Sequence, residues 1–386
     1  MMPDSRTKLL LIGMADSVHL GRWILQFKDT PLDVTLFPSS PHRRIHPIIK
    51  GLIRAKGNNL TVTVAPSSMR WLALPLSVVD LILNNRSRAM LLRRVIASRP
   101  FDLIHVQEIQ HAGYLLLGAG LGSHRSNVVV TNWGSDIFWF ERFPRHKSRI
   151  SELLKIATHY SAECHRDIAI VKKMGFSKAI MPVIPNGGGV DLTQIPAELT
   201  PTSHRRKIII KGYTGFVGRA TDSIRACEAA ADCLDSYEVM VYSASLLSRL
   251  LLLRLRFRRG IRVRVIKKRT PQSVMLQHFA ESRIYIGASL SDGISTSLLE
   301  AMATGCYPIQ TGTSCANEWL TTTSGSIVTP RNISEICNAI RLAVQDDTYV
   351  DSAAAVNRST IAERGSSAAV SASAINFYSM IARRSF

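Results

Sequence analysis

The chain has 386 residues, of which 46% are hydrophobic and 20% are charged, as is ordinary for a globular protein. Its 48 Lys and Arg residues outnumber its 28 Asp and Glu residues, giving a formal charge of +20. This excess favours an anionic partner, which could be nucleic acid, an anionic membrane face or a phosphorylated substrate. The six cysteines are scattered without a CxxC pair, which excludes a disulfide framework or a zinc site and indicates a reducing compartment.

The chain start MMPDSRTKLLLIGMADS contains an apolar run of only about six residues, which is shorter than the apolar core of a signal peptide. We therefore expect no signal peptide. The longest apolar stretches elsewhere, such as Trp71 to Leu83, are interrupted by Asp80 and fall short of the ~20 residues that span a bilayer. No membrane-spanning helix is expected.

Short apolar runs alternate with helical patterns along most of the chain. This βαβ alternation predicts parallel sheets that are covered by helices on both faces. The strands expected in chain order are Lys8–Ile12, Val34–Phe37, Leu60–Val64, Leu103–Val106, Asn127–Thr131, then Ile208–Ile210, Glu238–Tyr242, Ile261–Ile266, Ile284–Ile286, Tyr307–Gln310 and Ser326–Val328.

The two series of strands are separated by residues 182–206, which are rich in Pro, Gly and Thr and read as a linker. The fold class is thus α/β, with two doubly wound Rossmann-like halves joined near residue 195. We expect a first domain over 1–195, a second over 196–366, and a closing helix over 367–386 that packs back on the first domain. The length agrees with two domains of roughly 150–200 residues each.

The stretch SDGISTSLLEAMATG (291–305) directly follows an expected strand, where ligands bind in open α/β sheets. Ser295 or Thr296 is a good N-cap, and Gly305 is a natural helix stop. Asp292 then lies in the loop before the helix and Glu300 about one turn inside it. The N–H groups between them form an anion site flanked by carboxylates, which suits the phosphates and hydroxyls of a nucleotide sugar.

These residues resemble the E-x7-E motif of family 4 glycosyltransferases, which are retaining enzymes of the GT-B fold. Further similarities run along most of the chain: FDLIH at 101–105, WGSD at 133–136, PNG at 185–187 followed by Val190-Asp191, and NEW at 317–319. The sequence departs from the family at the first acid, which is Asp292 instead of Glu. It also lacks the double glycine of the N-terminal loop and a clearly aligned Arg/Lys phosphate clamp.

The resemblance implies a GT-B enzyme, with two domains facing across a cleft, that transfers a sugar from a nucleotide-sugar donor with retention. Lys211 and Arg219 are the candidate phosphate cations, and Asp292 is the acid beside the donor sugar. The residues expected to bind the donor are Gly212, Gly215, Gly293, Ile294, Ser295, Thr296, Glu300 and Glu318. No obligatory metal or other cofactor is expected, and no DxD tripeptide occurs.

The same resemblance places the acceptor in the first domain. His111 and Asp136 are expected as polar contacts near the anomeric centre, and Ser17, His19 and His105 as acceptor-binding residues. Each has a plainer interpretation: a lone histidine is often a satisfied structural group, and Asp136 could cap the helix that follows it. Arg219 and Lys211 could likewise be solvated charges beside a glycine turn.

Ten basic residues and no acid occur between 246 and 269, where LLSRLLLLRLRF reads as a basic amphipathic helix and IRVRVIKK as a strand with one basic face. Residues 42–56 and 69–94 mix apolar and basic residues similarly. A solvated charged face is the plain interpretation. We favour peripheral attachment of a cytoplasmic protein to the anionic inner face of the membrane, where a glycan or lipid-linked acceptor would be met.

Three other functions compete with this interpretation. A nucleic-acid-binding protein is suggested by charge alone, but the sequence shows no known reading module, so no nucleic-acid partner is expected. An oxidoreductase would need a GxGxxG fingerprint after the first strand, which GMADSVHLG lacks. A sugar-nucleotide epimerase shares the GT-B layout and stays open. A non-catalytic relative also stays open, because the first acid of the motif is substituted. The phrase at 291–305 also resembles bacterial enzymes of surface-polysaccharide or lipopolysaccharide synthesis.

Overall fold

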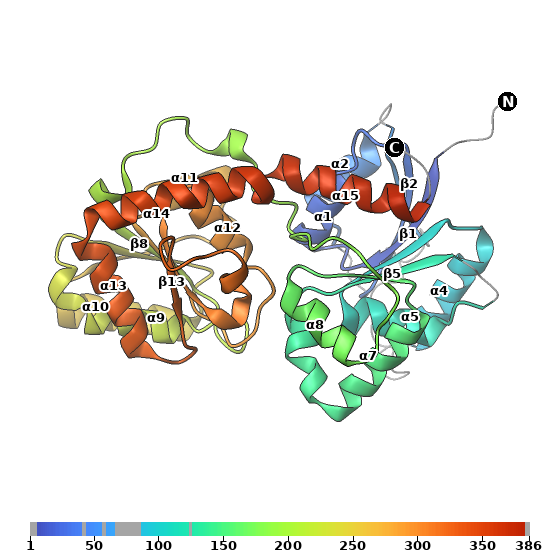
Figure 1. The fold of residues 1–386 in the computed structure, drawn as a ribbon, viewed down its shortest axis with the longest axis horizontal. Helices are drawn as coiled ribbons and strands as arrows, with labels where there is room; N and C mark the ends of the chain where they lie inside the picture. Colours follow the sequence, from blue (N-terminus) through green and yellow to red (C-terminus); the bar gives the residue numbers. More distant parts are fainter. Residues whose placement is uncertain (1–5, 41–43, 56–58, 66–85, 123–125, 383–386) are drawn as a thin grey trace. The chain divides into compact units, whose positions relative to one another are not determined.

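The computed structural model describes residues 6–40, 44–55, 59–65, 86–122 and 126–382 (Figure 1). The apolar stretch from Trp71 to Leu83 lies outside the described residues, as do parts of the basic segments 42–56 and 69–94 and the last four residues of the expected closing helix. The described chain forms two compact units. One contains the residues up to Gly188 together with those from Val370 onward, and the other contains Gly189–Ala369.

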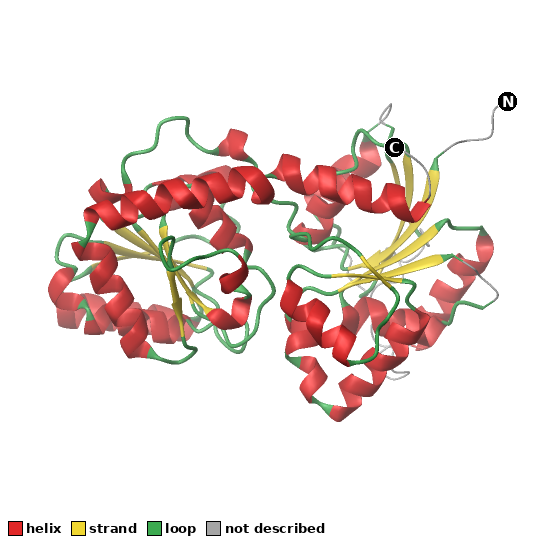
Figure 2. Cartoon of the chain, viewed as in Figure 1, coloured by secondary structure: helices red, strands yellow, loops and turns green. Residues whose placement is uncertain are grey.

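The first unit is built on a seven-stranded parallel sheet in the order β3-β2-β1-β4-β5-β6-β7. Its central strands are almost wholly buried, because helices cover both faces of the sheet (Figure 2). The strands are β1 (Thr7–Gly13), β2 (Leu32–Pro38), β3 (Thr61–Val64), β4 (Leu103–Gln107), β5 (Asn127–Thr131), β6 (His159–Ser161) and β7 (Ala179–Ile180).

The five strands expected in this half are all present, and two more extend the sheet. The prediction missed β6 and β7, which have only three and two residues. Such short segments carry no readable alternation of apolar and polar residues. Each joins the edge of the sheet by pairing with the preceding strand: His159 lies opposite Val129, and Ala179 lies opposite His159.

The helices of the first unit include a π-helical turn, η2, directly after β4. They are α1 (Val18–Leu25), α2 (Pro47–Arg54), α4 (Arg86–Ser98), η2 (Ile109–Gly113), α5 (Tyr114–Ala119), α6 (Ser135–Phe138), α7 (Pro144–Ile156) and α8 (His165–Lys173). The closing helix α15 (Ser367–Ala382) adds Phe377 and Tyr378 to the core that contains Trp23. The Trp23 indole N–H donates to the Tyr378 hydroxyl at 3.0 Å, and this hydrogen bond joins α15 to α1.

The second unit has a six-stranded parallel sheet in the order β10-β9-β8-β11-β12-β13. Its strands are β8 (Lys207–Lys211), β9 (Glu238–Tyr242), β10 (Arg262–Val265), β11 (Ile284–Gly287), β12 (Tyr307–Thr311) and β13 (Ser326–Val328). All six were expected. Its helices are α9 (Ala220–Ala229), α10 (Leu246–Arg259), α11 (Gln272–Ala280), α12 (Thr296–Ala303), α13 (Ile333–Gln345) and α14 (Asp347–Thr360), followed by the π-helical turn η9 (Ile361–Gly365). Both sheets have the reversal of strand order, at β1/β4 and β8/β11, that defines a doubly wound fold.

The chain passes between the units at a glycine pair. Gly189 has φ +71°, and a Cβ there would lie 2.7 Å from the Ser366 carbonyl oxygen, so the backbone conformation and the close approach both require glycine. Val190 next to it forms a bridge with Ser366. The division between Gly188 and Gly189 falls inside the segment 182–206 that the sequence marks as a linker.

Among the helices that the structure describes, none combines the length and the apolar character needed to cross a bilayer.

Candidate functional site

In the second unit, polar side chains gather where β8 and β11 end. Lys211 is the last residue of β8, and its Nζ donates to Asp292 Oδ2 at 2.7 Å and to Ser295 Oγ at 3.3 Å. Asp292 lies in the loop after β11, so neighbouring strands of the sheet bring the pair together. Parallel strands end at the same edge, which explains how residues 81 positions apart meet.

Lys211 is nearly buried, with 9% of the residue exposed. Burial by itself would lower the pKa of Lys211, but the Asp292 carboxylate outweighs it and holds that pKa above its ordinary value. The lysine is therefore charged at neutral pH. A buried cation that keeps its charge is suited to bind a phosphate or to stabilise one as it leaves.

Helix α12 begins beside this pair, with Ser295 as its N-cap. The Ser295 hydroxyl accepts from Lys211 and makes no capping hydrogen bond to the first turn of α12. The Leu298 and Leu299 N–H groups donate to the Ser295 carbonyl, which leaves those of Thr296 and Ser297 to face an anion. Glu300 lies one turn further along, is buried to 7% exposure, and accepts from the Gln272 amide.

The loop after β8 contains the glycines that the sequence assigned to diphosphate binding. Gly212 has a structural reason to be glycine, because a Cβ there would lie 2.1 Å from the Tyr242 carbonyl oxygen of β9. Gly215 has φ +104° and open space around its Cα, so its backbone is exposed to a ligand. Arg219 stands at the N-cap position of α9, and its side chain donates two N–H groups to Asp222, at 2.8 and 3.1 Å. Lys211 is hence the cation that the structure brings to Asp292 and Ser295.

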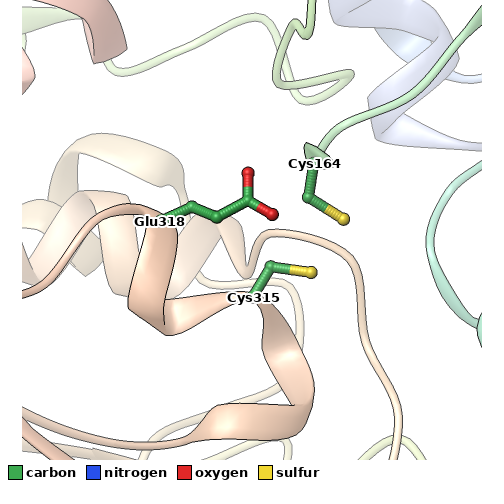
Figure 3. A group of neighbouring side chains, drawn as sticks. All are labelled: Cys164, Cys315 and Glu318. Carbon is green, nitrogen blue, oxygen red and sulfur yellow. The ribbon is translucent and has the colours of Figure 1, made fainter. Parts of the chain in front are cut away.

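The loop after β12 carries Glu318 and contacts the loop of Asp292, whose N–H donates to the Thr313 carbonyl at 3.4 Å. The Cys315 thiol and the Glu318 carboxylate lie within 4.8 Å of each other (Figure 3). Cys315 has φ +54°, an uncommon conformation for a residue with a side chain. Cys164, also labelled in Figure 3, belongs to the first unit. Two ligands from one unit are fewer than a zinc site requires, so Cys315 and Glu318 do not by themselves form one.

In the first unit, the first turn of α1 and the loop after β5 bring His19 and Trp133 together. Their rings meet edge to face with centroids 5.7 Å apart. The Ser17 hydroxyl caps α1 by accepting from the His19 N–H at 3.2 Å. Ser17 is thus engaged by its own helix, whereas the His19 and Trp133 side chains are half-buried at the ligand-binding edge of the sheet.

The loop after β4 places His111 on the surface and two carboxylates beneath it. Glu108, at φ +75°, accepts from the His111 and Ala112 N–H groups at 2.9 and 2.7 Å. Asp136 accepts from the Ile109 N–H at 3.1 Å and the Trp133 N–H at 2.7 Å. Asp136 therefore ties two loops together, and burial raises its pKa well above the ordinary value. His111, in contrast, is exposed and can reach a ligand.

His105 lies in the interior of β4 and is fully buried, which differs from the position at the sheet edge that was expected for acceptor contact. Its Nδ1 and Nε2 are each 2.7 Å from a hydroxyl, that of Tyr378 and that of Thr131. Burial lowers the pKa of His105 to about 3, so the ring is neutral. The structure gives His105 the role of joining β4, β5 and α15.

The burial of His105 predicts a specific loss of stability in acid. Histidine in the unfolded chain binds a proton below about pH 6.5, whereas folded His105 does so only near pH 3. The free energy of unfolding is therefore unaffected by this difference above about pH 6.5 and falls as the pH drops below it. From pH 7 to 5, the free energy of unfolding of the wild type should fall by about 2 kcal/mol relative to His105→Asn. Urea unfolding of both proteins at the two pH values measures this difference.

Glu108 should affect the pH dependence of stability in the opposite direction. Burial raises the pKa of Glu108 to about 7 despite the three backbone N–H groups that lower it. The folded state then binds a proton between pH 4.5 and 7 that the unfolded state releases, so the wild type should gain stability relative to Glu108→Gln on the same pH change. Parallel pH dependences of wild type and both variants would contradict these assignments.

Sequence reasoning missed the partners of the predicted residues. It named neither Gln272, which holds Glu300, nor Tyr378, which holds His105. These partners lie on other helices, 28 and 273 positions along the chain, and neither lies in a recognisable motif. The positive φ of Glu108 was also missed, because it is a property of the folded loop.

Comparison with known proteins assigns one family to each unit. Residues 8–163 match the model described as glycosyl transferase 4-like, and residues 251–346 match the model described as glycosyl transferases group 1. Together the two matches cover more than half of the chain. No curated protein matches the chain by sequence.

Solved structures with the same fold align over nearly the whole chain. HepE from Anabaena, in complex with UDP and glucose, is 16% identical and has a TM-score of 0.68 over 97% of this chain and 100% of its own. Sucrose-phosphate synthase from Thermosynechococcus elongatus is 12% identical, with a TM-score of 0.70 over 97% and 99%. The E. coli trehalose-6-phosphate protein bound with UDP-2-fluoro glucose is 13% identical, with a TM-score of 0.69 over 98% and 99%. The chain has the GT-B fold and is a glycosyltransferase, with a family 4-like first unit and a group 1 second unit.

Proposed function

We propose that the protein is a retaining glycosyltransferase that moves a hexose from a nucleotide sugar to a glycan or lipid-linked acceptor. The observation that carries this proposal is the group formed by Lys211, Asp292 and the uncapped start of α12, with Glu300 buried one turn below. A nucleoside diphosphate sugar can bind to all of these groups. Its phosphates would accept hydrogen bonds from the cation and the N–H groups, and its ribose hydroxyls would donate to the carboxylate.

The proposed division of roles follows from these contacts. Lys211 and the N–H groups of Ser295 and Thr296 stabilise the diphosphate as it leaves, where negative charge develops. Glu300 accepts hydrogen bonds from the ribose hydroxyls. Asp292, whose other oxygen accepts from the Gly293 N–H at 3.0 Å, holds Lys211 and faces the donor sugar. Glu318 and Arg219 are candidates for further donor contacts.

The donor is proposed to be a UDP-sugar. HepE and the E. coli protein are each described in complex with UDP or a UDP-sugar, so this nucleotide is the first to be tested. A thermal-shift screen of the full chain against UDP-, GDP-, ADP- and CMP-sugars identifies the base. Anomeric NMR of the product then decides the stereochemistry: the same configuration in donor and product supports retention, and inversion overturns it. Turnover of the nucleotide sugar without any acceptor, to an isomeric nucleotide sugar, would favour the epimerase.

Attachment to an anionic membrane face is proposed from helix α10. Its large apolar residues Leu246, Leu250, Leu253 and Phe257 are exposed at helical spacing, Leu246 by 76% and Phe257 by 80%. Basic residues surround them on α10 and β10, and no acid occurs between 246 and 269. An exposed apolar stripe within a basic surface is the pattern of a helix that lies in a lipid interface. A surface of this kind would give the enzyme access to lipid-linked acceptors in cell-surface polysaccharide or lipopolysaccharide synthesis.

The double variant Leu250→Ser, Leu253→Ser should bind vesicles of phosphatidylglycerol and phosphatidylcholine at least about tenfold more weakly than the wild type. Burying each leucine side chain in the lipid contributes roughly 1.5 kcal/mol to the binding free energy. Co-sedimentation measures the affinity. The matched control is Leu342→Ser on α13, whose leucine is 43% exposed. Equal binding by wild type and double variant, or no preference for phosphatidylglycerol over phosphatidylcholine alone, would overturn the membrane proposal.

A further inference from the structure

A cavity of about 430 Å³ opens in the first unit at the edge where β2 and β4 end. Ser39 follows β2, Gln110 and His111 follow β4, and Arg86 begins α4, so the cavity lies where α/β sheets bind ligands. Besides His111, none of the residues expected from the sequence to contact a substrate lines it.

The charged residues among the described lining of this cavity are all basic. They are Arg86, Arg88, Arg93, Arg149 and, when protonated, His111, and no carboxylate occurs among its described lining residues. Four guanidinium groups around one cavity give it a positive potential that favours an anionic ligand. Arg86 and Arg88 also lie in the first turn of the 13-residue helix α4, where the helix dipole adds positive potential.

Two of these arginines are held in place by the fold. Arg88 is 6% exposed and donates to the Ser39 carbonyl. Arg149 lies over the Tyr114 ring, with its Cζ 3.9 Å from the ring centroid. Guanidinium groups that are already positioned lose little freedom when they bind a phosphoryl group through paired N–H bonds.

A second observation points to a ligand. The Ser39 side chain is 1% exposed, lines the cavity, and its hydroxyl has no hydrogen-bond partner within the described part of the chain. A buried hydroxyl without a partner is costly, and a ligand oxygen in the cavity would satisfy it. Arginines and a hydroxyl donor together match the oxygens of a phosphate.

We propose that this cavity binds a phosphoryl group of the acceptor, so that the acceptor is a phosphorylated sugar or a lipid-linked phosphate. The inference rests on the proposed function and deepens it, since it gives the acceptor a chemical class. The phosphate would anchor the acceptor in the first unit, while a hydroxyl of the same molecule receives the sugar.

The test compares two double variants with the same change of charge on the same helices. Arg93→Gln, Arg149→Gln removes two guanidinium groups that line the cavity, and Arg94→Gln, Arg145→Gln removes exposed neighbours that do not. Calorimetric titration with glucose 6-phosphate, with glucose as the neutral counterpart, measures the soluble ligand. Binding to phosphatidylcholine vesicles with and without phosphatidylinositol, whose head group carries both a phosphate and free hydroxyls, measures the lipid one; α10 is unchanged in both variants.

A phosphate-dependent affinity that falls at least about tenfold in the cavity variant and stays within twofold in the control supports the proposal. The arm in which this occurs identifies the source as soluble or lipid-linked. Equal binding by both variants, or no preference for the phosphorylated ligand in either arm, overturns it. Hydrolysis of the donor without acceptor reports on the second unit separately, so a failure of the proposed transferase function is distinguishable from a failure of this inference.

Discussion

Lys211→Gln should lower kcat for sugar transfer by about 10²–10³-fold, the effect typical of removing one preorganised group from a developing charge. Lys211 is nearly buried and stays charged because Asp292 Oδ2 lies 2.7 Å away. In the proposed mechanism the leaving diphosphate takes up negative charge beside it. A group that acts chiefly in the transition state affects kcat more than KM.

The matched control for this variant is Lys207→Gln. Lys207 begins the same strand and also forms an ion pair, with Glu281 at 2.6 Å, but at the opposite end of the sheet. Its replacement should leave kcat within twofold. Steady-state kinetics with the donor found in the nucleotide screen, alongside circular dichroism of each variant, measures the effect. Unchanged kcat in a folded Lys211→Gln protein would remove this lysine from the mechanism.

The same kinetics decide between the two cations that the sequence offered for the phosphates. Arg219 already directs two N–H groups to Asp222, so Arg219→Gln should lose less activity than Lys211→Gln. A greater loss in Arg219→Gln would show that the guanidinium leaves Asp222 to bind the donor, and the roles of the two cations would then be reversed.

Glu300→Gln should weaken donor binding by about 10- to 100-fold, since a hydrogen bond to a charged group contributes about 1.5–3 kcal/mol. Glu300 is 7% exposed and one turn into α12, where its carboxylate is fixed by the Gln272 amide. Ribose hydroxyls are held equally in the ground state and the transition state. The variant should therefore raise KM for the donor and leave kcat close to its original value.

Titration calorimetry with UDP measures this loss without requiring an acceptor. Glu198→Gln is the matched control, because Glu198 is an exposed acid of the second unit and lies outside the proposed site. A fall in kcat with an unchanged KM would assign Glu300 to the chemistry instead of the nucleoside. Equal UDP affinity in all three proteins would show that the nucleotide binds elsewhere.

The shortened first acid of the motif has a structural explanation. Asp292 is one methylene shorter than the glutamate of the resembled family, yet it contacts Lys211 directly and also accepts from the Gly293 N–H. Both carboxylate oxygens are therefore engaged in the loop. The charge that the motif requires is present, and a cation at the end of the neighbouring strand compensates it.

The sequence by itself determined the two parallel sheets, eleven of their strands and the position of α12. Buried parallel strands need continuous apolar runs, and helices need caps and stops, so both leave local signals such as Lys8–Ile12 and the pair Ser295 and Gly305. Asp292, Ser295 and Glu300 were predicted as a group in the same way, because the residues around a helix start are contained in one short stretch of chain.

Only the tertiary structure decided which side chains meet. It placed His105 in the core under Tyr378, gave Arg219 to Asp222, and brought Lys211 to a carboxylate 81 positions away. It also gathered Ser39, Arg88 and Arg149 around one cavity from segments that carry no common motif. Contacts of this kind depend on strand order and packing, which bring distant residues together through the whole fold and leave no local pattern to read.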